Sequence, residues 1–320
     1  MISALVLAAM LAAAPPQPAL PAPQDPPPAN AAAIADTPTD LDDVQVVGRP
    51  LDTMIRSFVS EVAAPNRYRG IARWESNICI GVANLRAEPA QYLVDRISTV
   101  AENVGLNPGA PGCSPNVIIV ASDKPDEITQ AMVEERHRAF RMGGTGMDRG
   151  GDAFEDFIQS DRPVRWWQVS MPVDSETGKR AARIDGDCQA PCNLPIDYAP
   201  IINVAAASRL NQQVVDTIIR TVIVLDMNKI EGLSTLQLAD YIAMITLAQI
   251  NPDAETNRYA SILNVFDDPE TVDTLTNWDL AYLDGLYSAE RNRIDLRANR
   301  SEIVSSIQDA HTRLQSQDPG

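Results

Sequence analysis

The stretch that decides the fold is GLSTLQLADYIAMITLAQINPD, residues 232–253. Ser234 precedes an apolar run and Gln237 follows three residues later, a capping-box pattern in which each side chain satisfies a free backbone N–H at the start of a helix. Residues 234–249 are apolar on nearly every face, which is typical of a helix buried in a protein interior. The run ends before Pro252 and is shorter than the roughly 20 residues that cross a bilayer. We therefore expect a buried central helix over about 234–249 and no transmembrane span.

Around this helix the sequence predicts one globular α+β domain over residues 44–290, with a mixed β-sheet packed on the central helix. Near its N-terminal half, a strand pattern at 78–83, a helical stripe at 89–104 and a buried run at 116–121 predict a βαβ unit. Residues 215–226 combine helical spacing with β-branched content, and we favour a strand over 218–225.

The ends of the chain differ from this domain in composition. Residues 1–14 form a signal-like apolar segment, and the Pro- and Ala-rich residues 15–43 predict a disordered tether. Residues 291–320 predict a C-terminal amphipathic helix and tail, with Asn299 and Glu302 as its capping box. We therefore expect a periplasmic or secreted protein.

Four cysteines fit an exported protein. They allow three pairing schemes, and sequence order favours the one that joins Cys79 to Cys113 and Cys188 to Cys192. The alternative is a cytosolic protein with four buried thiols. The second pair has C-x-x-x-C spacing, which fits neither a zinc site nor the C-x-x-C of redox enzymes.

The charge of the chain limits its partners. The formal net charge is −17, from 43 acidic and 26 basic residues. A surface of this sign repels nucleic-acid phosphates and anionic lipid surfaces. We expect no nucleic-acid partner, and the candidate partner is an envelope protein or a peptide.

The central helix and the residues after it resemble the active-site region of matrixin-like zincins, a branch of the zinc-dependent proteases. In that family the helix carries two His one turn apart with a Glu after the first, and further short motifs follow. The corresponding residues here are Ala239-Asp240-Tyr241-Ile242-Ala243, Ile245-Thr246-Leu247, Ser261-Ile262-Leu263, Leu275-Thr276 with Asp279, and Leu286-Tyr287. The resemblance implies a zincin-like fold.

The same alignment implies that the zinc chemistry is lost. Both ligand positions are alanine, Ala239 and Ala243, and the position of the catalytic base is Asp240. A zinc site needs about three protein ligands, and the two histidines of the chain, His137 and His311, lie far from the helix in sequence. We expect no metal site and no cofactor.

A wider resemblance covers most of residues 44–290. Stretches such as PVRWWQVSMPVD (163–174) and LTNWDLAYL (275–283) are similar to an uncharacterised family of secreted alphaproteobacterial proteins. That family has no assigned activity, so this resemblance supports export and implies no reaction.

Three functions compete. The first is an exported, non-catalytic protein that keeps a degenerate zincin-like fold for binding, and the second is a purely structural envelope component. The third is a carboxylate-dependent hydrolase that pairs Asp240 with another acid, Asp226 or Asp279. The non-functional alternative for Asp240 is a structural carboxylate that is hydrogen-bonded to backbone or to an arginine.

Trp166 and Trp167 are adjacent in a predicted strand, so their side chains point to opposite faces. We expect one of them in the core. The other is a candidate for a binding surface, where Trp is enriched, or it covers the edge of the sheet.

Overall fold

The computed structural model describes residues 50–75, 77–142, 146–184, 188, 192–200, 202 and 209–317. The signal-like segment at 1–14, the tether at 15–43 and the start of the predicted domain at 44–49 lie outside these residues.

The described residues form a mixed α and β structure with seven α-helices and two sheets. The helices are α1 (Leu51–Val62), α2 (Ala87–Asn103), α3 (Pro125–Phe140), α4 (Gly151–Gln159), α5 (Thr235–Leu247), α6 (Asn277–Ser288) and α7 (Leu296–Gln317). The strands are β1 (Asn77–Ile78), β2 (Ile80–Ala83), β3 (Asn107–Pro108), β4 (Val117–Ser122), β5 (Val164–Asp174) and β6 (Val214–Asp226). Two short 3₁₀ segments, Pro195–Tyr198 and Ile262–Asn264, complete the described elements.

The main sheet has four strands in the order β2-β4-β6-β5. Strands β2, β4 and β6 are parallel, and β5 pairs with β6 in the antiparallel direction at one edge. The predicted βαβ unit is confirmed, because β2 and β4 are parallel neighbours joined through α2. The uncertain run at 215–226 is a strand, β6, and it is longer than expected because it pairs with β4 on one side and β5 on the other.

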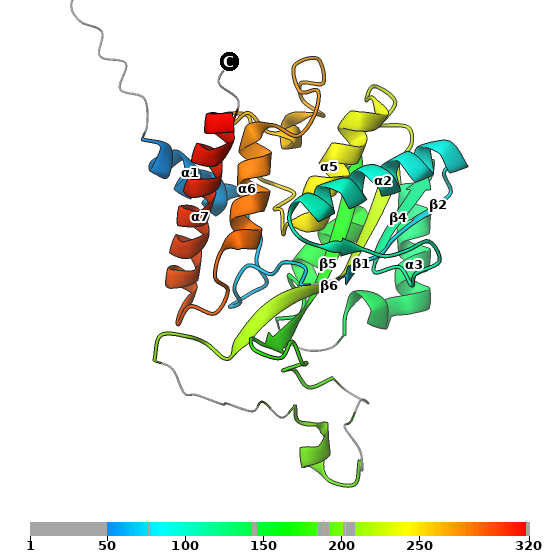
Figure 1. The fold of residues 1–320 in the computed structure, drawn as a ribbon. Helices are drawn as coiled ribbons and strands as arrows, with labels where there is room; N and C mark the ends of the chain where they lie inside the picture. Colours follow the sequence, from blue (N-terminus) through cyan, green and yellow to red (C-terminus); the bar gives the residue numbers. More distant parts are fainter. Residues whose placement is uncertain are drawn as a thin grey trace, which may run out of the picture. The chain divides into compact units, whose positions relative to one another are not determined.

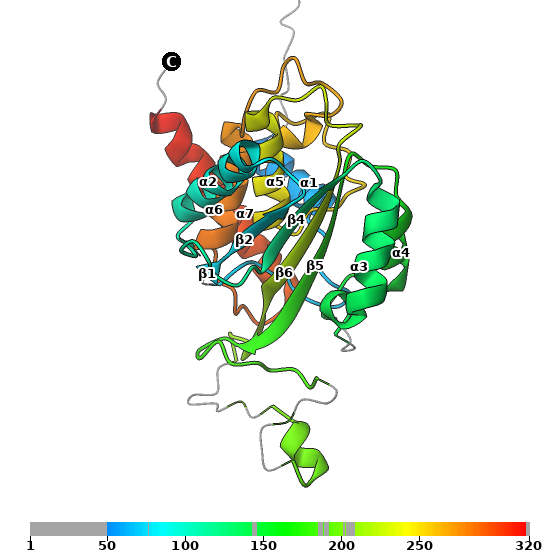
Figure 2. The same cartoon turned by 90° about the vertical axis from the view of Figure 1, so that its right-hand side faces the viewer.

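Both faces of this sheet are covered by helices, as Figures 1 and 2 show. Trp167 of β5 and Val222 of β6 lie in an apolar cluster with Phe154 and other side chains of α3 and α4. Their neighbours Ile223 and Leu225 point the opposite way into the main core, which contains α5. The alternation of side chains along a strand therefore divides β6 between two cores.

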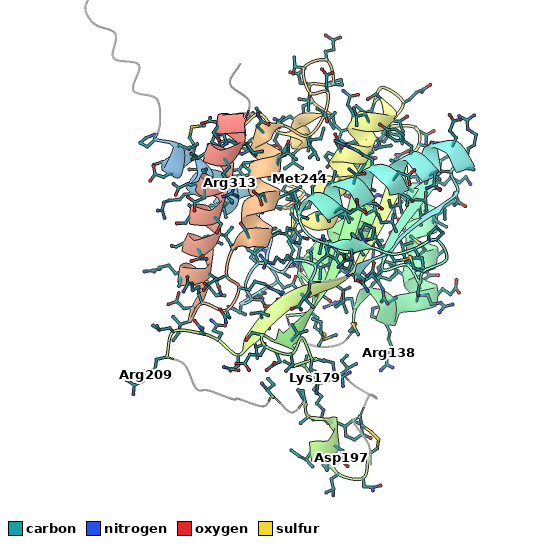
Figure 3. The ribbon with its side chains drawn as sticks, viewed as in Figure 1. Arg138, Lys179, Asp197, Arg209, Met244 and Arg313 are labelled. Carbon is teal, nitrogen blue, oxygen red and sulfur yellow. A yellow bond between two sulfur atoms is a disulfide. The ribbon has the colours of Figure 1, made fainter. Side chains whose placement is uncertain are left out.

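The central helix forms as the sequence predicts. The Ser234 hydroxyl accepts from the Gln237 N–H at 3.1 Å, and the Gln237 side-chain oxygen accepts from the Ser234 N–H at 2.8 Å. Met244, labelled in Figure 3, is fully buried, as are its neighbours on every face of α5. The helix ends at Leu247, two residues before the expected limit, because the backbone is extended at Ala248. No helix among the described residues has the length and apolar character of a membrane span.

Helix α7 packs on α6 and shares the main core. A Cβ atom added at Gly285 of α6 would lie 2.5 Å from the Ile307 backbone, so only glycine permits this approach. The predicted capping box at Asn299 is wrong, because α7 begins earlier, where the Asp295 carboxylate accepts from the Ala298 N–H at 2.7 Å. Glu302 instead pairs with Arg293 at 2.9 Å.

Candidate binding site

Asp240 has no exposed surface, and each of its carboxylate oxygens accepts hydrogen bonds from the protein. Arg96 of α2 donates hydrogen bonds to both oxygens, with Nε 2.5 Å from Oδ1 and Nη2 3.0 Å from Oδ2. The Thr274 hydroxyl and the Leu275 N–H both donate to Oδ2. The hydrogen bond to Asp240 raises the pKa of Arg96. These contacts match the structural alternative, in which the carboxylate fastens α5 to α2 and to the loop before α6.

The other two candidate acids have partners of their own. Asp279 accepts from the Ser261 hydroxyl at 2.6 Å and the Ile262 N–H at 2.8 Å, and it caps α6 through Thr276. Burial raises the pKa of Asp279 even though these hydrogen bonds act in the opposite direction. Asp226 accepts from the Asn228 N–H at 3.0 Å at the end of β6. Among the described residues, Asp240 shares no hydrogen-bond donor with either acid, so the contacts favour separate structural roles.

The two tryptophans divide as expected between the faces of the sheet. Trp167 is 2% exposed, packs against the tilted Phe154 ring with ring centroids 4.9 Å apart, and donates to the Phe140 carbonyl at 2.8 Å. Trp166 is half-buried and meets the Tyr241 ring edge-on with centroids 6.3 Å apart. Trp166 also lines a small cavity of about 10 Å³ beside Arg149, too small for a ligand larger than water.

The two histidines lie apart from α5. His137 is exposed on α3 and meets the Phe154 ring edge-on with centroids 6.1 Å apart. His311 is half-buried on α7 against Trp278, 5.6 Å between centroids. Among the described residues no group of three or more His, Cys, Asp or Glu side chains is arranged to hold a metal ion.

Ala239 and Ala243, which stand at the ligand positions of the zincin resemblance, are both fully buried. The segment that follows α1 packs against the end of α5 and the residues just after it. The Gln249 carbonyl accepts from the Ala64 N–H at 2.9 Å, and its side-chain oxygen accepts from the Ala72 N–H at 2.7 Å. Trp74 donates to the Thr246 carbonyl at 2.8 Å. Residues 64–74 therefore pack against the end of the central helix through polar contacts as well as apolar ones.

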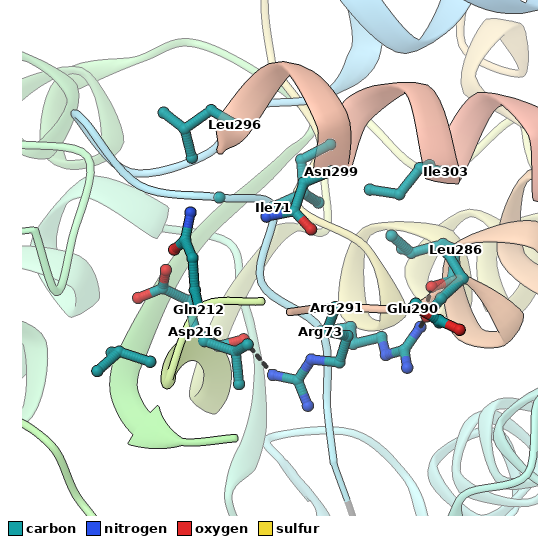
Figure 4. Close-up of a pocket in the computed structure, with 14 residues that line it drawn as sticks. Ile71, Arg73, Gln212, Asp216, Leu286, Glu290, Arg291, Leu296, Asn299 and Ile303 are labelled. Atoms are coloured by element: carbon teal, nitrogen blue, oxygen red, sulfur yellow. Dashed lines mark hydrogen bonds between the residues drawn. The ribbon is translucent and has the colours of Figure 1, made fainter. Parts of the chain in front are cut away.

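The same segment forms one wall of a groove whose other wall is the start of α7 (Figure 4). At the inner end of the groove the Arg73 guanidinium donates to two carbonyls at the end of α6, Leu286 and Ala289. Burial and, to a smaller extent, the positive charge of the neighbouring Arg291 lower the pKa of Arg73 to about 10. Arg291 donates to the Asp216 carbonyl and lies 3.5 Å from Glu75. This inner region holds two half-buried cations, Arg73 and Arg291, and each donates to backbone carbonyls.

A third arginine joins the inner and outer parts of the groove. Arg69 pairs with Asp216, with Nη2 2.7 Å and Nε 2.9 Å from Oδ1. Burial raises the pKa of Asp216, and the pairing with Arg69 acts against this shift. The pairing with Arg69 therefore favours the charged form of Asp216.

The outer part of the groove is a pocket of about 520 Å³. Its lining contains four arginines and no acidic residue: Pro65, Asn66, Arg67, Tyr68, Arg69, Gly70, Ile71, Leu296, Arg297, Asn299, Arg300 and Ile303. Pockets of roughly 300–1,000 Å³ are the usual size for small-molecule sites. This is the strongest candidate binding site among the described residues.

Comparisons with known proteins give no match. No protein-family model, no curated protein and no solved structure is similar to this chain at a significant level.

None of the four arginines of this pocket was singled out by the sequence, where they lie in two segments at 67–69 and 297–300. Their one local signal is that basic residues recur within a few positions in a chain that is otherwise acidic. The contact between the two segments is a property of the fold, and neither segment predicts it alone.

Both predicted disulfides are present. Cys79 and Cys113 are bonded with Cα atoms 6.1 Å apart, and Cys188 and Cys192 with Cα atoms 5.7 Å apart. The first bridge joins the start of the sheet to the approach to β4. Disulfide-bonded cysteines are consistent with an oxidising compartment outside the cytosol.

Proposed function

We propose that this chain is an exported, non-catalytic binding protein with a degenerate zincin-like fold. On this proposal, the framework of a protease active site is kept as a scaffold, and methyl groups stand where the metal ligands would be. Its partner is a peptide or a protein of the cell envelope.

The observation that carries this proposal is the environment of Asp240. A general base must reach the proton that it abstracts. The Asp240 carboxylate is fully buried and is held by Arg96, Thr274 and Leu275, so it has no free approach to a substrate. Ala239 and Ala243, at the ligand positions of the resemblance, offer no ligand atoms, and their burial leaves them in contact with other parts of the core.

Two further observations support the fold and the location. A mixed sheet packed on a buried helix is the arrangement that the resemblance implies. The two disulfides support export together with the signal-like residues 1–14. A periplasmic or secreted location fits both.

Metal analysis tests the non-catalytic part of the proposal. The full chain, produced in zinc-supplemented medium and dialysed, is analysed for zinc by elemental mass spectrometry and for cleavage of unstructured protein substrates. We expect no stoichiometric zinc and no cleavage above the background of a matched preparation. One tightly held zinc per chain, or cleavage that copurifies with the protein and is abolished by a chelator, would overturn the proposal.

Restoring the family ligands gives an independent test of the same site. In Ala239→His/Ala243→His, two imidazoles must enter positions that have no exposed surface. Overpacking a core costs about 1–3 kcal/mol per site, so we expect a less stable protein in urea unfolding. Ala131→His, at an exposed position of α3, is the control and should be nearly neutral. A double variant as stable as the wild type would mean that a cavity already exists over α5.

A further inference from the structure

The outer pocket concentrates positive charge in a chain of the opposite sign. The protein carries 43 acidic and 26 basic residues, yet four arginines and no acid line this pocket. Figure 4 shows the adjoining inner pocket, where Ile71, Leu296, Asn299 and Ile303, which also line the outer pocket, face the same space. Like charges that share a pocket repel one another unless an anion joins them.

The pairing of these arginines leaves most of their donors unused. Arg69 is committed to Asp216. The Arg67 guanidinium lies over the Tyr68 ring, 5.2 Å from its centroid. Within the described part of the chain, no acid forms an ion pair with Arg67, Arg297 or Arg300, and all three are exposed. Three guanidinium groups on the rim of one pocket are therefore available to a ligand.

We propose that this pocket binds the phosphoryl group of a soluble phosphorylated small molecule. A phosphate monoester carries a charge of about −1.5 to −2 at pH 7 and three acceptor oxygens, so it can engage more than one guanidinium at once. A single carboxylate has two oxygens and is satisfied by one bidentate arginine. The aliphatic side chains of Ile71, Leu296 and Ile303 supply an apolar wall for the remainder of the ligand.

The charge of the rest of the molecule selects a soluble ligand over a membrane. A net charge of −17 opposes approach to an extended anionic surface. A small anion that reaches the pocket is screened from distant acids, because the Debye length is about 8 Å at physiological ionic strength. The proposal concerns a different surface from the α5 region and holds whether or not the protein is exported.

Titration calorimetry with inorganic pyrophosphate as the probe tests this inference. The variant Arg67→Gln/Arg297→Gln/Arg300→Gln removes the three unpaired cations of the pocket. The control Arg56→Gln/Arg86→Gln/Arg136→Gln removes three exposed arginines elsewhere and changes the net charge equally. We expect the pocket variant to bind at least tenfold more weakly than the wild type, and the control to differ by less than about threefold.

A second variant and two further probes make each outcome decisive. Arg297→Gln alone, at an exposed position in the first turn of α7, should weaken binding while leaving the thermal unfolding midpoint unchanged. Equal weakening in both triple variants, or no binding of pyrophosphate by the wild type, overturns the proposal. Binding of citrate with no binding of pyrophosphate overturns the choice of a phosphoryl group. Binding to vesicles of phosphatidylcholine and phosphatidylglycerol, with none to pyrophosphate, overturns the choice of a soluble ligand.

Discussion

Replacing Arg96 by leucine tests whether the buried carboxylate of Asp240 is an anchor of the core. Asp240 has no exposed surface, and Arg96 supplies two of its hydrogen bonds, at 2.5 and 3.0 Å. Removing one partner of a buried ion pair costs about 3–5 kcal/mol, because the other charge stays buried without compensation. The Arg96 side chain is 30% exposed, and Thr274 and Leu275 still donate to Asp240, so we expect the lower end, about 3 kcal/mol.

Urea unfolding followed by tryptophan fluorescence measures this loss. With a slope of about 3 kcal/mol per molar urea, a loss of about 3 kcal/mol lowers the unfolding midpoint by about 1 M. The control Arg136→Leu removes an exposed arginine that pairs with exposed Glu135, and it should change stability by less than about 0.5 kcal/mol.

The double variant Arg96→Leu/Asp240→Leu separates an ion pair from two independent losses. If the two charges depend on each other, the double variant should lose at least about 1 kcal/mol less than the sum of the two single variants. Additive losses, or a midpoint for Arg96→Leu within about 0.2 M of the wild type, would refute the reasoning. An unchanged midpoint would mean that Thr274 and Leu275 are sufficient to hold the carboxylate.

Two further predictions concern pH and the disulfides. Hydrogen bonds from the Thr177 hydroxyl and N–H, both 2.7 Å, hold the pKa of Asp174 below its ordinary value of 3.8. Its contribution to stability is therefore present above pH 3.8 and is lost as the pH falls through the lowered pKa. Urea unfolding should show a deficit for Asp174→Asn at about pH 6 that disappears toward about pH 2, and a deficit independent of pH would contradict this. The Cys79–Cys113 and Cys188–Cys192 bridges span sequence separations of 34 and 4. Replacing each pair by alanine should cost about 4 and about 2 kcal/mol on the chain-entropy model, a difference that thermal unfolding can resolve, and equal losses would argue against that model here.

The parts of the fold that sequence predicts well are those fixed by local signals. The capping box at Ser234 and the apolar run behind it define α5, because the residues that satisfy the helix start lie within the helix itself. Residues 215–226 give a mixed signal because β6 is buried on both faces, so its apolar residues do not alternate with polar ones. Its pairing with two neighbouring strands, which is not a local property, decides the matter.

Where a local pattern was wrong, a contact between distant residues explains it. Asn299 and Glu302 have the spacing of a capping box, but both side chains bond Arg293 instead. The Arg293 backbone N–H donates to the Asn299 side-chain oxygen at 3.2 Å, and the Arg293 guanidinium pairs with Glu302. Asp295 then caps the helix one turn earlier. The candidate pocket could not be predicted for the same reason, because its walls come from two segments that meet only in the folded chain.

The segment that joins α5 to the groove also explains why the pocket can be tested without disturbing the core. From Ile71 to Glu75 the side chains alternate, as expected for extended backbone. Ala72 and Trp74 are buried toward the central helix, whereas Ile71 and Arg73 line the groove on the other side. Because the contacts to α5 come from backbone groups and from Trp74, substituting exposed arginines of the pocket leaves them in place. A loss of ligand binding in those variants with an unchanged unfolding midpoint would therefore report on the pocket alone.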